Sequence, residues 1–134
     1  MVDRVCLIVD DEPAIRRYVR AILARDYVEV LEATSVAEAL KIVEKLGSHL
    51  DLVVSDIKMP GDMNGVDLAC SIHNSFPALP VILISGYADA ELARRIPASF
   101  AFIKKPFVPE TILDAARRAF AVRDQSSATQ IRVA

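Results

Sequence analysis

Five residues of this sequence have side chains suited to metal and phosphate chemistry, and each stands where a short apolar run ends. They are three acids, a hydroxyl and a lysine: Asp10, Asp11, Asp56, Ser85 and Lys105. Carboxylates that crowd together repel one another and burial strengthens the repulsion, so a cluster of the acids favours a bound cation. Mg²⁺ suits such a cluster because it takes one or two carboxylates together with water and phosphate oxygens. A carboxylate between Mg²⁺ and a lysine ammonium can attack phosphorus, which makes Asp56 a candidate for forming an aspartyl phosphate.

The apolar runs beside these residues predict β-strands. Continuous apolar runs bounded by polar or turn residues are typical of strands buried on both faces of a sheet, and β-branched or aromatic residues favour the same assignment. Such runs occur at Val5–Val9, Tyr27–Leu31, Leu50–Ser55, Val81–Ser85 and Phe100–Ile103. Every run except the second ends with, or is followed by, at least one of the five metal- and phosphate-binding candidates named above.

Segments with apolar residues at helical spacing separate the runs and predict helices. We expect them from Pro13 to Leu23, from a capping box at Ser35–Glu38 to Leu46, from about Gly65 to Ser75, weakly over Asp89–Arg95, and from Pro109 onward. Strands that alternate with helices predict parallel βαβ units, and hence an α/β fold with a doubly wound sheet covered by helices on both faces. Ligands bind such sheets beyond the carboxyl ends of the strands, and the five candidate residues lie at those ends.

Length and composition fit one globular domain. The chain has 134 residues, of which 53% are hydrophobic and 25% are charged. A formal net charge of −2 gives no basic surface for nucleic acid, and no apolar run approaches the roughly 18 residues that a membrane span needs. Cys6 and Cys70 lack CxxC spacing, so we expect buried free thiols and a cytoplasmic location.

We expect the domain to occupy residues 1–122. Residues 123–134 lose the apolar period, which predicts a flexible tail; a partner-binding extension or the start of a linker is the alternative.

The sequence resembles the response-regulator receiver domains of two-component signalling systems, the family of the chemotaxis receiver. The resemblance spans about residues 4–122 and depends on five motifs in order: VDDE at 9–12, SDIKMPG at 55–61, NG at 64–65, SGY at 85–87 and KKPF at 104–107. It implies a flavodoxin-like receiver fold, with a five-stranded parallel sheet in the order 2-1-3-4-5.

The resemblance also implies roles for the acidic residues. Asp56 is expected to be the phosphoacceptor. Asp11 is expected to ligate Mg²⁺ directly, Asp10 mainly through water, and the backbone carbonyl of Lys58 as a third protein ligand. Lys58 and Tyr87 flank the site where the family tunes the lifetime of the aspartyl phosphate.

Four further assignments follow from the resemblance. Ser85 is expected to hydrogen-bond one phosphoryl oxygen and Lys105 to pair with another, while a cis peptide bond at Pro106 orients the lysine. Phe102 occupies the aromatic switch position, where the family's ring turns inward as the hydroxyl of Ser85 moves; a core aromatic is the alternative for Phe102. The sequence departs from the family pattern in two places: Phe102 lacks the tyrosine hydroxyl common there, and the MPGDMNG turn is one residue longer than usual.

The function that the resemblance implies is a stand-alone, single-domain response regulator. A histidine kinase or phosphotransfer protein would donate the phosphoryl group, and a downstream partner would recognise helix four, strand five and helix five; a homodimer is a further possibility. The chain would then be a signalling domain and not an enzyme with an external substrate. A receiver module from a hybrid histidine kinase is the alternative, although Met1 so close to the first strand favours a natural start.

Other function classes fit the residues less well. A haloacid-dehalogenase-type phosphatase needs a second acid two residues after its nucleophile, where this sequence has Lys58. A flavodoxin needs a hydroxyl- and glycine-rich loop after the first strand, where this sequence has acids. A degenerate receiver is disfavoured because the acids, the hydroxyl and the lysine are all present. His49 and His73 are expected at the surface, with no phosphohistidine role.

Overall fold

A parallel sheet of five strands forms the centre of the protein, in a computed structural model that describes residues 3–86, 94, 96 and 100–133. The strand order is β2-β1-β3-β4-β5, and every neighbouring pair runs parallel. Both findings confirm the predicted fold class and topology. The strands are β1 (Arg4–Val9), β2 (Val28–Ala33), β3 (Leu52–Asp56), β4 (Val81–Ser85) and β5 (Ala101–Lys104).

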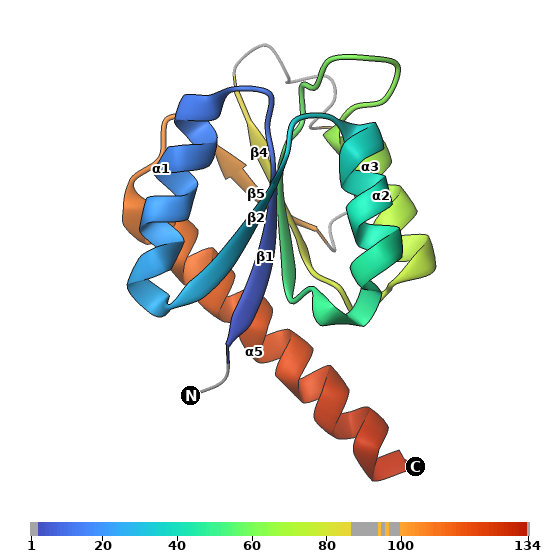
Figure 1. Cartoon of the computed structure of the whole chain (residues 1–134). Helices are drawn as coiled ribbons and strands as arrows, with labels where there is room; N and C mark the ends of the chain where they lie inside the picture. The colour runs from blue at the N-terminus through green and yellow to red at the C-terminus, as the bar shows by residue number, and fades with distance from the viewer. Residues whose placement is uncertain (1–2, 87–93, 95, 97–99, 134) are drawn as a thin grey trace.

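Helices cover both faces of the sheet. Figure 1 shows α1 and α5 on one face and α2 and α3 on the other. Their bounds are α1 (Pro13–Leu23), α2 (Val36–Leu46), α3 (Gly65–Ser75) and α5 (Pro109–Val133), with short 3₁₀ turns at Ala24–Asp26 and Gly47–His49. Apart from Arg94, the short helix expected at 89–95 lies outside the described residues, as does Tyr87.

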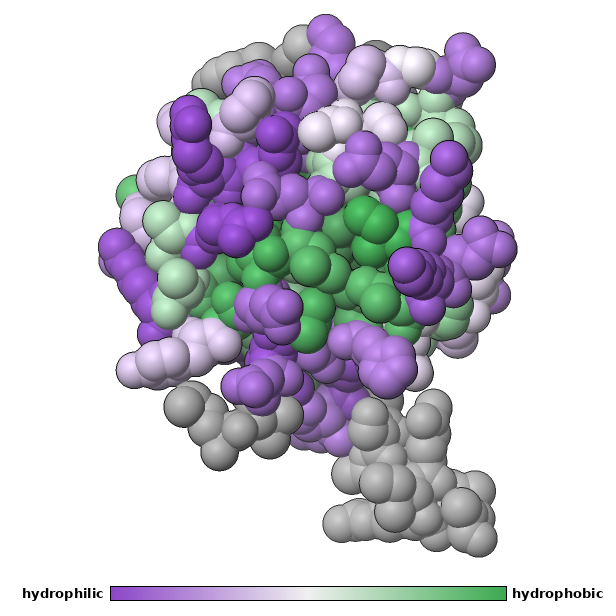
Figure 2. Space-filling view, in the orientation of Figure 1, coloured by the Kyte–Doolittle hydropathy of each residue, from purple (hydrophilic) through white to green (hydrophobic). Residues whose placement is uncertain are grey.

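Each face of the sheet carries its own hydrophobic core, because successive strand residues point to opposite faces. In β1, Leu7 and Val9 pack in the core under α2 and α3, whereas Cys6 and Ile8 pack in the core under α1 and α5. The inner strands are therefore apolar at nearly every position, which explains their continuous apolar runs. Figure 2 shows the side of the molecule on which β2 lies. Apolar residues gather there between α1 and α2, and hydrophilic residues surround them.

The structure corrects several element boundaries. Tyr27 does not belong to β2: it is left-handed, with φ 58°, and 70% exposed after the 3₁₀ turn. Leu50 and Asp51 precede β3, which extends to Asp56. The helix α5 continues past residue 122 to Val133, although the sequence lost its apolar period there.

Side-chain capping explains where α2 and α3 begin. Ser35 Oγ accepts a hydrogen bond from the Glu38 amide at 3.1 Å, while the Glu38 carboxylate accepts one from the Thr34 hydroxyl. The predicted capping box therefore forms in its first half. A complete capping box that was not predicted opens α3, where the side chains of Asn64 and Asp67 each accept a hydrogen bond from the other residue's amide.

Candidate metal and phosphorylation site

The predicted acidic cluster forms at the carboxyl edge of the sheet. Asp10, Asp11 and Asp56 each offer a carboxylate oxygen, and these oxygens lie within 4.8 Å of one another. Strand pairing is the cause: Val9 of β1 is opposite Ser55 of β3, so the residues that follow them, Asp10 and Asp56, lie at the same level of the sheet edge. Asp10 and Asp56 are buried, whereas Asp11 is exposed.

Asp10 is held by its main chain and its side chain. Its amide donates to the Ala33 carbonyl at 3.1 Å, and its Oδ1 accepts from the Glu12 amide at 2.9 Å. Burial raises the pKa of Asp10; the Glu12 amide and the charge of Lys105 act in the opposite direction, and the neighbouring acids add to the increase. A buried carboxylate in this environment gains stability when a cation joins the cluster.

Lys105 supplies a positive charge beside Asp56. Its Nζ lies 3.5 Å from Asp56 Oδ1, with the lysine side chain 27% exposed and the aspartate side chain 8% exposed. The Lys105 amide donates to the Ser85 carbonyl at 2.7 Å, and the Lys105–Pro106 peptide bond is cis. The cluster of acids thus has a lysine on one side, as expected for a carboxylate that receives a phosphoryl group.

Ser85 and Lys58 are the two remaining predicted site residues near this cluster, and their side chains differ in burial: Ser85 is buried and Lys58 is exposed. Ser85 is buried at the end of β4, and its hydroxyl donates to the Gly86 carbonyl at 3.0 Å. Ile84, one residue earlier, pairs with Asp56 across the sheet. Lys58 stands two residues after Asp56 in the following loop, with its side chain exposed.

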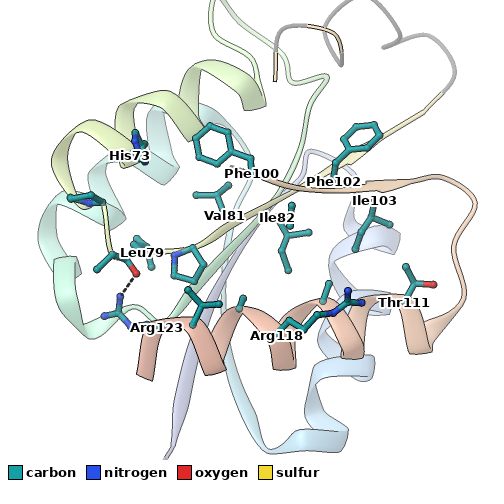
Figure 3. Close-up of a pocket in the computed structure, with 17 residues that line it drawn as sticks. His73, Leu79, Val81, Ile82, Phe100, Phe102, Ile103, Thr111, Arg118 and Arg123 are labelled. Atoms are coloured by element: carbon teal, nitrogen blue, oxygen red, sulfur yellow. Dashed lines mark hydrogen bonds between the residues drawn. The ribbon is translucent and has the colours of Figure 1, made fainter. Parts of the chain in front are cut away.

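Phe102 is not a core residue. Its side chain is 40% exposed on β5, so the core alternative for this aromatic is wrong. It lines an apolar groove of about 560 Å³ between β4, β5, the segment before β4 and α5. Figure 3 shows Ile103 pointing from β5 toward α5, which contributes Thr111 and Arg118 to the groove. The rings of Phe100 and Phe102 lie on the other side of β5.

Two residues that sequence reasoning did not place in the site contact its backbone. Gly65 approaches Asp56 so closely that a Cβ atom on Gly65 would lie 2.2 Å from the Asp56 carbonyl oxygen. Arg16 donates from Nη1 to the Asp10 carbonyl oxygen at 2.8 Å. The sequence indicated Gly65 only as part of the NG motif and as the expected start of a helix, and nothing in the pattern of α1 distinguished Arg16 from its neighbouring arginine.

A comparison with family models decides the family. Residues 6–117 match the model described as the response regulator receiver domain. This chain belongs to the response regulator receiver family. Receiver domains are signalling domains and not classical enzymes, and those of two-component systems interact with kinases. The acidic cluster of this receiver is typical of the family's phosphorylation site and is consistent with a divalent metal site.

Curated relatives carry this receiver as part of longer chains. The sensor kinase CckA of Brucella abortus is 45% identical over 104 residues, which cover 75% of this chain and 11% of CckA. The C4-dicarboxylate transport transcriptional regulatory protein DctD of Pseudomonas aeruginosa is 36% identical over 120 residues, covering 87% of this chain and 25% of DctD. The receiver thus spans about a tenth to a quarter of the length of these relatives.

Solved structures share the fold over nearly the whole receiver. A response regulator receiver domain protein from Clostridium thermocellum superposes with a TM-score of 0.82 at 30% identity, covering 91% of this chain and 98% of the other. A CheY-like receiver domain protein from Methanospirillum hungatei gives the same TM-score and identity, covering 93% and 99%. Among the described residues, no helix of this receiver is long and apolar enough to cross a membrane.

The structure leaves both cysteines as thiols. Cys6 is buried in β1 and Cys70 is exposed on α3, so the expectation that both are buried is wrong for Cys70. Burial raises the pKa of the Cys6 thiol far above its ordinary value, which keeps it protonated and unreactive.

Proposed function

We propose that this receiver accepts a phosphoryl group on Asp56 from a histidine kinase or a histidine phosphotransfer protein, with Mg²⁺ bound at the acidic cluster. One observation carries the proposal: a buried carboxylate lies within the cluster of acids and has a lysine ammonium 3.5 Å from its Oδ1. An exposed surface acid would have neither the restricted environment nor the fixed cation. We place the reaction in the cytoplasm.

The transfer is a substitution at phosphorus. A carboxylate oxygen of Asp56 forms the new P–O bond, while the bond from phosphorus to the donor's histidine nitrogen breaks and its electron pair stays on that nitrogen. The donor's histidine leaves as a neutral imidazole when its other ring nitrogen carries a proton. Lys105 stabilises the negative charge on the phosphoryl oxygens, and Ser85 becomes a hydrogen-bond donor to one of them.

The donor set fits Mg²⁺. Hard oxygen ligands in the form of one or two carboxylates suit this ion, and the cluster offers them from Asp10, Asp11 and Asp56. The backbone carbonyl of Lys58 is the third protein ligand that we propose. Bound there, Mg²⁺ supplies positive charge that offsets the repulsion among the carboxylates and the phosphoryl oxygens.

Phosphorylation then changes the surface around β5. The Ser85 hydroxyl leaves the Gly86 carbonyl for the phosphoryl group, and the exposed ring of Phe102 turns toward the vacated space. The apolar groove between β5 and α5 supports this surface as the place where a downstream partner or a second copy of the receiver binds (Figure 3). The exposed and the inward-turned positions of the Phe102 ring would thus give this surface different affinities for a partner.

The test is phosphorylation with acetyl phosphate and Mg²⁺, followed by mass spectrometry of the intact chain. The wild type should gain one phosphoryl mass, and Asp56→Asn should gain none. Lys105→Ala should still bind Mg²⁺ but lose the conformational response to phosphorylation. Retained labelling of Asp56→Asn would exclude this residue as the phosphoacceptor.

A second candidate is a receiver module within a hybrid histidine kinase. The 45% identity to a stretch of CckA, which is named as a sensor kinase, favours it. The stand-alone and the hybrid forms share the same chemistry at Asp56. They differ in the donor, so phosphotransfer profiling against the kinases of the source organism separates them: a hybrid receiver should prefer the kinase encoded in its own reading frame.

A further inference from the structure

Arg16 joins the acidic turn to the edge strand β2. From α1, its Nη1 donates to the Asp10 carbonyl oxygen at 2.8 Å and its Nε donates to Glu32 Oε1 at 2.9 Å. The guanidinium thus makes two directed contacts at once, and its side chain is only 15% exposed. This geometry is what a planar guanidinium provides and a single ammonium does not.

Glu32 is itself fixed from two sides. It lies in β2 opposite Ile8 of β1, and Arg20, one turn further along α1, donates to its Oε2. Burial raises the pKa of Glu32, but the hydrogen bonds and charges of Arg20 and Arg16 outweigh burial and hold that pKa below its ordinary value. The carboxylate that anchors Arg16 therefore stays ionised near neutral pH.

The contact of Arg16 determines the orientation of the peptide between Asp10 and Asp11. A peptide unit is planar, so fixing the Asp10 carbonyl also fixes the direction in which the Asp11 amide and Cα leave it. The other side of Asp10 is held by its amide, which donates to the Ala33 carbonyl at 3.1 Å. Both peptide groups of Asp10 are thereby tied to β2, one directly and one through Arg16.

We propose that Arg16 is a positioning residue of the metal centre, which keeps the Asp10 and Asp11 carboxylates directed toward Asp56 before the ion binds. This inference rests on the proposed function. The three carboxylates repel one another, and Asp11 is exposed, so its low-energy position without a restraint is turned away into water. Arg16 opposes that movement through the backbone. Residues of this kind commonly change metal affinity when they are removed.

The test is the Mg²⁺ affinity of Arg16→Ala, measured by calorimetry and by the Mg²⁺ concentration that gives half-maximal phosphorylation by acetyl phosphate. We expect affinity to fall by about 10-fold or more, the lower end of the range for residues that orient metal ligands. The maximal phosphorylation rate at saturating Mg²⁺ should stay near that of the wild type, because the hydrogen bonds of Arg16 go to Asp10 and Glu32.

Two variants make the test specific. Arg16→Lys should give an intermediate affinity, because an ammonium in this position reaches the carbonyl or Glu32 but does not match both. Arg17→Ala removes the same charge from the next residue of α1, which is exposed, and should leave Mg²⁺ affinity within twofold of the wild type. The melting temperature without metal shows whether each variant is folded.

Three results would overturn the inference while leaving the proposed function intact. The first is unchanged Mg²⁺ affinity in Arg16→Ala. The second is an equal loss in Arg17→Ala, which would indicate a general charge effect. The third is a lower maximal rate that Mg²⁺ does not restore in either Arg16→Ala or Arg16→Lys. A wild-type receiver that neither binds Mg²⁺ nor takes up phosphate would instead contradict the proposed function.

Discussion

At Asp10, burial and the charge of Lys105 act on the pKa in opposite directions. Burial is the main cause that raises its pKa above the ordinary value, so the folded state binds its proton more tightly than the unfolded state does. Below the unfolded pKa both states are protonated and the residue has no effect on stability. As pH rises from the unfolded pKa through the folded pKa, the charged carboxylate destabilises the folded protein, and the loss grows with the difference between the two pKa values.

Asp10→Asn should therefore be nearly neutral at pH 3 and stabilising at pH 7 when Mg²⁺ is absent. The quantity to compare is the difference in the free energy of unfolding between variant and wild type, from urea titrations at both pH values. Taking the difference cancels the titration of the other carboxylates. A stabilisation at pH 7 no larger than that at pH 3 would contradict the expected direction.

Gly65 is a second residue whose effect can be predicted. A Cβ atom there would lie 2.2 Å from the Asp56 carbonyl oxygen and 2.8 Å from the Ile57 Cα, both of which are backbone atoms. Gly65→Ala should thus displace the end of β3, with a loss of about 1–3 kcal/mol for an overpacked site, and slow phosphorylation of Asp56.

Gly61→Ala is the matched control for Gly65→Ala. A Cβ atom at Gly61 would meet open space, but the φ of +96° strains alanine there, so Gly61→Ala should cost about 1–3 kcal/mol through backbone strain alone. Phosphorylation of the Gly61→Ala variant should stay close to the wild-type rate. Equal effects of the two substitutions on the phosphorylation rate would show that the close approach of Gly65 to the Asp56 carbonyl does not determine that rate.

At the scale of elements, α5 is fastened to the amino-terminal end of the sheet. The Arg123 guanidinium donates to Asp51 Oδ1 at 3.3 Å, to the Ala78 carbonyl at 3.1 Å and to the Ser48 carbonyl at 2.7 Å. Asp51 in turn accepts from the Val5 amide at 2.8 Å. One side chain thus joins α5 to the segments that precede β3 and β4, and Figure 1 shows the helix continuing beyond this end of the sheet.

Arg123→Ala should destabilise the receiver by about 1–3 kcal/mol, because it removes three hydrogen bonds between α5 and the segments that precede β3 and β4, one of them to the partly buried Asp51 carboxylate. Urea unfolding followed by circular dichroism measures the loss. The control is Arg118→Ala on the same helix: Arg118 is exposed and donates to the Asp114 carbonyl of its own helix at 3.3 Å, so its loss should stay within about 0.5 kcal/mol. A similar loss in both variants would argue against a specific role for the Arg123 contacts.

The elements also show what the sequence could and could not predict. Strands buried on both faces are apolar throughout, so β1, β3 and β4 were recognisable, and the acids at their ends located the site. Tyr27 has strand-like chemistry but adopts a left-handed turn, which local propensity does not indicate. The contact of Arg16 with Asp10 depends on where β2 places Glu32, and such long-range geometry has no local pattern.

At the scale of the whole molecule, the acidic cluster connects strands that are far apart in the chain. Asp10 follows β1 and Asp56 ends β3, so their carboxylates come together only when these strands pair. Mg²⁺ bound as we propose would therefore favour the folded receiver over the unfolded chain, and by mass action it would stabilise the fold. Without the ion, the same three charges oppose folding.

Mg²⁺ at ten times its dissociation constant should stabilise the receiver by about 1.4 kcal/mol. For a domain of this size, that corresponds to a rise in melting temperature of roughly 5 °C. Circular dichroism melts in MgCl₂ and in NaCl of equal ionic strength separate ion binding from general screening. Asp11→Ala, which removes an exposed acid of the cluster, should lose most of the Mg²⁺-dependent rise. Its melting temperature in NaCl should be no lower than that of the wild type, because one of the mutually repelling charges is gone. An equal rise in the wild type and in Asp11→Ala would mean that Mg²⁺ stabilises the protein at some other place, and the acidic edge of the sheet would no longer account for metal binding.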